Sequence, residues 1–206
     1  MIKIKKKKPM PLWQKVFYVF SFIFLIGAFI YLGTKNYSVP ARRVTDAEAF
    51  SKEYGVSAKN KFKYMDGKDT LNVLKNGTGV IFMGYPENEW CKVYAEILYN
   101  AARDVELNTI YYYNFYKDRA NNTHVYQNIV KELKSHLPVI DVDSQNIYGP
   151  LLVVVKNGQI IYYDDETSVR IGDIELDEFW TMDKRINKET DIFNVLFQFV
   201  GDSYDS

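Results

Sequence analysis

The feature that most constrains how this chain can fold is an uncharged run near its N-terminus. No charged residue lies between Lys15 and Lys35, a stretch of 19 residues dominated by aromatic and aliphatic side chains. About 20 such residues are enough to cross a lipid bilayer as a helix. Trp13 and Tyr31 flank the run, as aromatic residues do at membrane interfaces. The sequence therefore predicts a transmembrane helix over residues 16–34.

The charges on either side of this run predict its orientation. Residues 1–15 hold six Lys and no acidic residue. Positive charge is retained on the cytoplasmic side of a membrane, so the N-terminus is expected in the cytoplasm. The prediction is a single-pass protein of the plasma membrane. It has a basic tail (1–15), a linker (35–43) and an extracytoplasmic domain (44–206).

A cleaved signal peptide is the alternative interpretation of the same run. Signal peptides have a shorter apolar core that ends in a small-x-small cleavage site. Here the run is long and leaves through "YLGTKNYS", which is a poor cleavage site. No cysteine follows closely, which argues against a lipoprotein. The sequence favours an uncleaved anchor.

Charge and residue usage exclude several function classes. Beyond residue 15 the chain carries 20 basic and 26 acidic residues, a net charge of −6. An acidic body argues against a nucleic acid partner, because binding phosphates needs a basic surface. A single cysteine excludes an internal disulfide framework. The two histidines, His124 and His136, lie outside any metal-ligand spacing, so neither a metal nor another cofactor is expected.

The remaining sequence alternates between helical and strand patterns. Strands are expected over 61–65, 79–84 and 109–115, and a hairpin over 150–164 that turns at Asn157-Gly158. Helices are expected over 44–55, 69–77, 89–103, 122–137 and 187–200. Thr45 and Glu48 have the spacing of a capping box, and Asp66-Gly67 is expected to form a turn. From residue 79 onward the order is strand, helix, strand, helix, hairpin, helix.

Two short segments give this order a specific meaning. "GYPENEWCKVYAEIL" (84–98) places Cys91 at the start of a helix that follows a buried strand. "GPLLVVVKNGQI" (149–160) places Pro150 directly before a hairpin strand. Over about residues 60–200 the chain resembles the thioredoxin-like family. It is most similar to the membrane-attached members of Gram-positive bacteria, a group that includes bacteriocin-transport accessory proteins. The resemblance implies an α/β thioredoxin-like fold, a central mixed sheet flanked by helices, and a cis Gly149–Pro150 bond.

The resemblance leaves two positions open for Cys91. Some members of this group carry the site "GxPxCPWC". Aligning "GYPENEWC" with it matches Gly84, Pro86, Trp90 and Cys91 without a gap. In this register Cys91 is the second, resolving cysteine, Asn88 replaces the attacking cysteine, and Glu89 replaces a proline. In the alternative register "EWC" precedes the first cysteine, and Cys91 is the nucleophile. The helix pattern after Cys91 favours the second position.

The favoured register removes the usual chemistry of the family. Without the first sulfur no internal disulfide can form. Asn88 can cap a helix but cannot attack sulfur. Glu87 and Glu89 are expected to raise the pKa of a nearby thiol, because negative charge disfavours a thiolate. Phe82 stands where family members often place a buried carboxylate. These changes argue against dithiol–disulfide exchange.

Two functions follow from the resemblance. In the first, the domain is a redox-inactive module that binds an extended peptide or protein partner in the groove of the family. The residues expected to line the groove are Tyr85, Asn88, Glu89, Trp90, Tyr148, Gly149 and Pro150. In the second, Cys91 is the catalytic residue of a monothiol thiol–disulfide oxidoreductase, or the thiol of a redox sensor. A structural subunit of a transport complex is a third possibility, and a free cysteine is most often only a small buried apolar residue.

Two acidic segments are read as ordinary loops. "DVDSQN" (141–146) is similar to a calcium-binding loop but lacks the glycine and the later glutamate of such loops. "DDE" (164–166) is expected to be a solvated turn.

Overall fold

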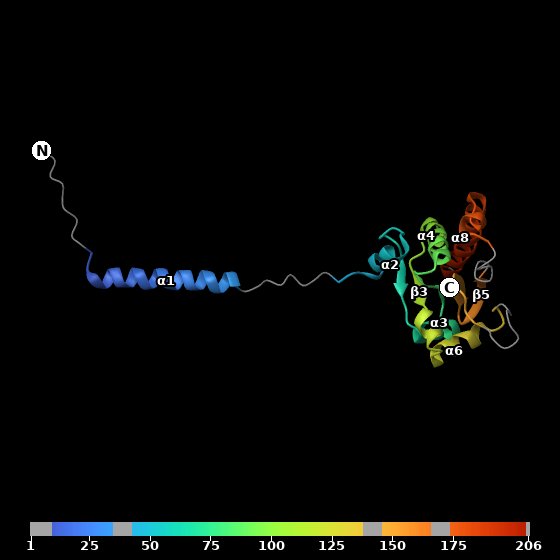
Figure 1. The fold of residues 1–206 in the computed structure, drawn as a ribbon, viewed down its shortest axis with the longest axis horizontal. Coiled ribbons are helices and arrows are strands. Elements are labelled where there is room, and N and C mark those ends of the chain that lie inside the picture. The colour runs from blue at the N-terminus through green and yellow to red at the C-terminus, as the bar shows by residue number, and fades with distance from the viewer. Residues whose placement is uncertain (1–9, 35–42, 138–145, 166–173, 205–206) are drawn as a thin grey trace. The chain divides into compact units, whose positions relative to one another are not determined.

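The computed structural model describes residues 10–34, 43–137, 146–165 and 174–204. The chain divides into two compact units, Met1–Arg43 and Val44–Ser206. Figure 1 labels the helices and strands of both. The units are described one at a time below.

The first unit contains one long helix, α1 (Leu12–Thr34). Large apolar side chains in its described part are exposed, for example Phe17 at 66% and Phe24 at 75%. Among the residues whose side chains are described, no helix is both long and apolar enough to cross a membrane. The transmembrane segment over 16–34 stays a prediction.

The second unit is built on a five-stranded mixed sheet. Its strands are β1 (Phe62–Tyr64), β2 (Gly79–Gly84), β3 (Ile110–Asn114), β4 (Leu151–Lys156) and β5 (Gln159–Asp164), in the order β1-β3-β2-β4-β5. β3 runs parallel to both of its neighbours, β1 and β2. β4 runs antiparallel to β2 and to β5. This agrees with the predicted mixed sheet.

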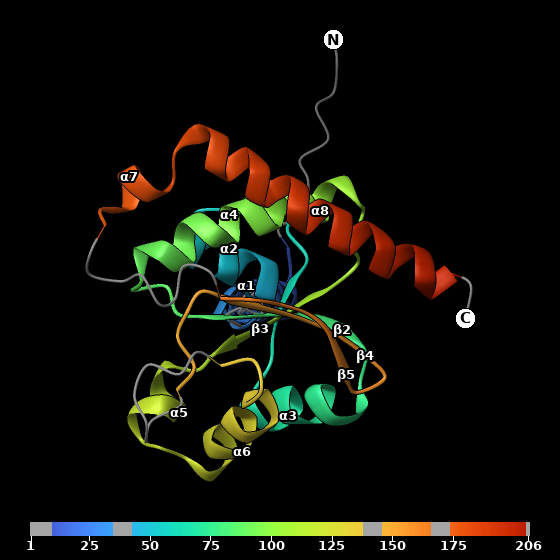
Figure 2. The same ribbon diagram turned by 90° about the vertical axis from the view of Figure 1, so that its right-hand side faces the viewer.

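Helices cover both faces of this sheet (Figure 2). On one face lie α2 (Asp46–Tyr54), α4 (Glu89–Asp104) and α8 (Met182–Tyr204). On the other lie α3 (Gly67–Asn76), α5 (Tyr116–Ala120) and α6 (His124–Leu133). A short helix, α7 (Leu176–Phe179), precedes α8. The predicted α/β class, a central mixed sheet flanked by helices, is confirmed.

Two apolar cores form because the side chains of a strand alternate between its faces. On β2, Val80 and Phe82 join the core under α4 and α8, while Ile81 and Met83 join the core over α3 and α6. All six residues of β2 are buried, as expected for a central strand covered on both sides. Because both cores use only residues of the second unit, this unit has what it needs to fold.

Local signals in the sequence explain where most elements begin and turn. Thr45 and Glu48 form the predicted capping box of α2. Asn157 and Gly158 both take a positive φ in the turn between β4 and β5. The expected turn at Asp66-Gly67 is wrong: Asp66 accepts hydrogen bonds as the N-cap of α3. Neither α5 nor α7 was expected, since both are too short to show a helical period.

The segment 164–166 also differs from its prediction. Asp164 is 6% exposed rather than solvated. Its Oδ2 accepts a hydrogen bond from the Tyr94 hydroxyl at 2.7 Å. The same oxygen forms an ion pair with Lys188 Nζ at 2.9 Å. The reason is that β5 carries Asp164 between α4 and α8, where a lysine matches its charge. The polar segment 141–146 lies, apart from Asn146, outside the described residues.

Candidate functional site

Asn88 connects the two loops that the sequence predicted to form a groove. Asn88 is the N-cap of α4, and its Oδ1 accepts a hydrogen bond from the Trp90 backbone N–H at 2.9 Å. Its Nδ2 donates to the Gly149 carbonyl at 3.1 Å, across 61 residues of sequence. The Gly149–Pro150 peptide bond is cis, as predicted. The Asn88 side chain therefore ties the start of α4 to the loop that precedes β4.

The thiol of Cys91 is enclosed between two glycines. The side chain is 0% exposed. A Cβ placed on Gly84 would lie 2.9 Å from Cys91 Sγ, and one placed on Gly149 would lie 3.2 Å from it. Contacts this short leave no room for a larger residue at either position. The last residue of β2 and the residue before Pro150 both have to be glycine-sized so that Sγ fits between them.

Enclosure also determines the protonation state of Cys91. Burial raises the pKa of the thiol to about 12, and a hydrogen bond with the Tyr85 backbone only partly opposes this. The prediction that Glu87 and Glu89 raise this pKa identified the wrong cause. Glu87 is exposed, and Glu89 is paired with Lys92 at 2.6 Å. The thiolate is the reactive form of cysteine, so this thiol is unreactive near neutral pH.

Among the described residues, Phe82 is surrounded by aromatic rings, and the nearby buried acid Asp164 is paired with Lys188. Phe82 is fully buried and stacks near Tyr94 and Tyr112, with ring centroids at 6.2 and 5.8 Å. The Tyr54 hydroxyl donates to the Tyr112 hydroxyl at 2.8 Å, and burial raises the pKa of both phenols. Both tyrosines therefore remain neutral. The core beside the thiol is an aromatic cluster rather than a proton relay.

The predicted aromatic lining of the groove separates into two parts. Tyr85 contacts Phe115 and Tyr116, with ring centroids at 5.7 and 5.1 Å. Trp90 instead contacts Phe179 of α7 at 5.2 Å. Tyr85 and Trp90 therefore have different neighbours, the first at the end of β3 and in α5 and the second in α7.

The remaining predicted residues are placed by the loop before β4. The Arg119 guanidinium lies over the Tyr148 ring at 4.7 Å and donates to the Ile147 carbonyl at 3.2 Å. Tyr148 is half-buried, whereas Gly149 and Pro150 are buried. Arg119 thus holds this loop against α5.

Sequence reasoning missed three residues of this region. Tyr116 is 53% exposed beside Tyr85. Phe179 and Arg119 each hold one of the predicted residues in place. For Tyr116 the only signal was the "NFYK" stretch (114–117), which begins within the predicted 109–115 strand and is too short to be read as a helix.

Near Trp90 one polar group is left without a partner. The indole N–H of Trp180 is buried and has no acceptor in the described part of the chain. An unsatisfied buried donor costs about 1–3 kcal/mol. Trp180 packs against Phe179 with ring centroids 5.1 Å apart. This end of the site therefore combines close aromatic packing with an unsatisfied group.

Comparison with known proteins does not assign the chain to a family. No model of a known protein family matches the chain, and no curated protein matches it either. Among the described residues, no three His, Cys, Asp or Glu side chains gather as a metal site would require. What remains is a region with one protonated, enclosed thiol, a hydrogen-bonded asparagine and partly exposed aromatic rings.

Proposed function

We propose that this chain is a bacterial, membrane-anchored, thioredoxin-like protein whose extracytoplasmic domain binds an extended peptide or a protein partner and does not catalyse dithiol exchange. The arrangement of the sheet supports the thioredoxin-like assignment. A helix carrying the cysteine at its start follows β2, and the loop with Pro150 leads into the neighbouring strand β4. A Gram-positive origin rests on the resemblance in sequence alone.

One observation carries the proposal: Cys91 is sealed between Gly84 and Gly149, and the Asn88 side chain binds the Gly149 carbonyl beside it. In the register that the sequence favours, Asn88 replaces the second sulfur. Disulfide exchange requires an attacking thiolate and a route to it. The monothiol alternative has the same requirement, and a fully buried thiol with a raised pKa disfavours it.

The surface around the sealed thiol supports binding. Tyr116, Tyr85 and Trp90 keep part of their rings exposed, and aromatic side chains are enriched at protein interfaces. The Gly149 carbonyl already accepts from Asn88, which leaves it one lone pair for a partner strand. We therefore expect aromatic contacts to contribute more than backbone pairing.

Membrane attachment is supported by the N-terminal unit. The uncharged run between Lys15 and Lys35 lies within α1, which is continuous from Leu12 to Thr34. The described apolar side chains of α1 project into solvent rather than into a core. The lysines that precede it favour a cytoplasmic N-terminus.

The proposal is tested by site-specific photo-crosslinking in intact cells. A photoreactive amino acid replaces Tyr116 in one variant and Phe197 of α8, which is 63% exposed, in a control. We expect partner adducts from position 116 and not from position 197, and the same adducts in a Cys91→Ser background. Adducts that disappear with Cys91→Ser or on reduction would instead support monothiol chemistry. Equal adducts at both positions would refute a site at this loop.

A further inference from the structure

A cleft lies at the other end of α4, away from Cys91. It has a volume of about 640 Å³ and is bounded by the segment 59–61, the C-terminal end of α4 with the following turn, and α8. Pockets that bind small molecules commonly enclose about 300–1,000 Å³. Twelve residues separate Cys91 from Arg103 along α4, which corresponds to roughly 18 Å. The cleft is therefore independent of the proposed function.

The floor of the cleft is apolar and continues beyond it. Its lining includes the buried residues Ala102, Leu107 and Ile110, and also Tyr99 and Val200 of α8. A second cavity of about 350 Å³ shares Leu107 and Val200 with the first. It then extends along Tyr111 and Phe199. Because the two cavities share lining residues they adjoin each other, and together they are called the trough below.

Positive charge stands at one end of this trough only. Lys59, Lys61 and Arg103 line the first cavity, whereas no lysine or arginine lines the second. Glu106 borders both cavities and is the one acidic residue in their walls. Nine of the 26 basic residues and none of the 26 acidic ones fall within residues 1–43, so residues 44–206 have a net charge of −9. The cluster of three basic residues around the first cavity therefore stands out on a domain whose net charge is negative.

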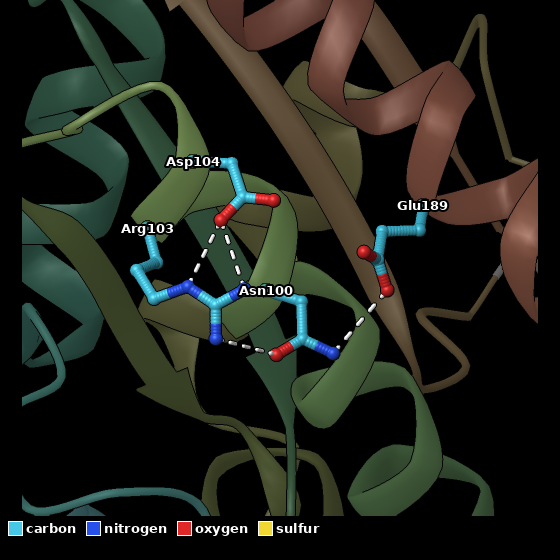
Figure 3. A network of polar contacts seen from close by, with 4 residues as sticks. All are labelled: Asn100, Arg103, Asp104 and Glu189. Carbon is cyan, nitrogen blue, oxygen red and sulfur yellow. Dashed lines mark hydrogen bonds and ion pairs between the residues drawn. The ribbon is translucent and has the colours of Figure 1, made fainter.

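The three cations are not equivalent. Figure 3 shows Arg103 held by Asp104 at 2.9 Å and by the Asn100 carbonyl, and Asn100 in turn donates to Glu189 of α8 at 3.2 Å. Asp104 therefore offsets much of the charge of Arg103. Lys59 and Lys61 form no ion pair with any described residue. The unbalanced charge belongs to these two exposed lysines.

We propose that this trough binds a single-chain amphiphile with an anionic headgroup, of the fatty-acid type. The chain lies along the apolar floor from Leu107 to Phe199, and the headgroup meets Lys59 and Lys61. A compact anion would leave the apolar length unused. A molecule without charge would gain nothing from the lysines. An elongated ligand with one charged end matches both features, and this complementarity selects the occupant.

The test uses the full chain in nanodiscs of uncharged lipid. A palmitic acid that carries a diazirine near the middle of its chain is photolysed with the protein, and labelled peptides are mapped by mass spectrometry. We expect labelling within residues 99–111 and 199–200, and displacement by unlabelled palmitate but not by hexadecanol. Labelling of α1 serves as an internal reference for probe delivery.

A charge-reversed variant makes the test specific. Lys59→Glu with Lys61→Glu should reduce labelling of the trough about fivefold relative to α1, because two attractive charges become repulsive and a fivefold loss of affinity corresponds to about 1 kcal/mol in all. The matched control, Lys52→Glu with Lys68→Glu, reverses two exposed lysines outside both cavities and should leave labelling unchanged. Equal labelling in the two variants would overturn the proposal. Displacement by phosphatidylglycerol but not by palmitate would overturn it as well, and would assign the trough to membrane phospholipid.

Discussion

The two ends of α4 differ in how accessible their functional groups are to solvent. At the N-terminal end, Cys91 is enclosed by Gly84 and Gly149, and Asn88 ties the neighbouring loops together. At the C-terminal end a cleft opens under Arg103. The residue type that attracts attention in the sequence is thus inaccessible, whereas ordinary lysines border the open site. Reactive residue types indicate function only where the fold leaves them reachable.

The polar contacts between α4 and its neighbours repeat this difference. Near the N-terminal end, Tyr94 and Lys188 of α8 both bind Asp164, and all three groups are buried. Nearer the C-terminal end, Asn100 reaches Glu189 of α8 in a partly exposed bond (Figure 3). Breaking a buried ion pair costs far more stability than breaking an exposed polar contact. Substitutions in the contacts near the N-terminal end of α4 should therefore destabilise the protein more than those near its C-terminal end.

The largest expected effect concerns the reactivity of Cys91. At pH 8 a thiol with a pKa of about 12 has roughly a thousandfold less thiolate than one with an ordinary pKa near 8.5. The native chain should therefore react with Ellman's reagent at least about a thousandfold more slowly than the urea-unfolded chain, measured by absorbance. Fast native labelling would show that the two ends of α4 are equally open.

The same shift gives a pH dependence of stability. The folded thiol holds its proton more tightly than the unfolded thiol, so the folded state binds more protons between about pH 9 and pH 12. The contribution of Cys91 is fully present below about pH 9 and is lost as pH rises through that window. Cys91→Ala should remove this part of the alkaline destabilisation, measured as the difference in unfolding free energy between pH 8 and pH 10.5.

Next in size is the buried ion pair. Lys188→Met removes the partner of Asp164, whose side chain is only 5% exposed, and should destabilise the protein by about 3–4 kcal/mol. Glu189→Ala is the matched change one residue further along α8, and should cost about 0.5 kcal/mol or less. Urea unfolding of both variants measures the contrast. Similar losses in the two would contradict the difference between the ends.

A smaller loss is expected from filling the space beside the thiol. Gly84→Ala brings a Cβ within 2.9 Å of Cys91 Sγ and should cost about 2 kcal/mol. Combining it with Cys91→Ala should recover part of that loss, because the clashing sulfur is gone. Gly201→Ala, where no atom lies within 4 Å of the added Cβ, is the control; because Gly201 lies in α8, alanine should stabilise the protein by about 0.5–1 kcal/mol rather than destabilise it. Additive losses in the double variant would show that the sulfur is not what fills this space.

These contrasts also show what the sequence could and could not predict. The run at 79–84 predicted a buried strand because every residue in it is apolar or glycine, and the structure buries all six residues. The hairpin predicted over 150–164 is present as β4 and β5. The capping box at Thr45 and the Asn157-Gly158 turn were recognisable because both depend on neighbouring residues alone. Elements of this kind are encoded within a few positions.

Asp164 and the trough were not predictable in this way. Nothing near Asp164 in the sequence indicates that Lys188 neutralises it, since the pair spans 24 residues and an adjacent acidic run suggests solvent. Lys61 begins the strand predicted over 61–65 and Lys59 lies just before it, and only the fold brings both to the C-terminal end of α4. The burial of Cys91 likewise depends on Gly149, which lies 58 positions away.

The smallest effect is expected where the structure is most open. Lys59→Glu with Lys61→Glu should change the free energy of unfolding by about 0.5 kcal/mol or less, because both side chains are exposed and neither forms an ion pair with a described residue. The measurement is urea unfolding beside the unmodified chain and the control Lys52→Glu with Lys68→Glu. Two like charges beside an apolar cleft are not expected to stabilise the fold. If replacing them leaves the free energy of unfolding unchanged, the lysines have no structural role, which is consistent with a role in ligand binding. A loss above about 1.5 kcal/mol would mean that the lysines stabilise the C-terminal end of α4 itself, and the contrast between a closed end and an open end would fail.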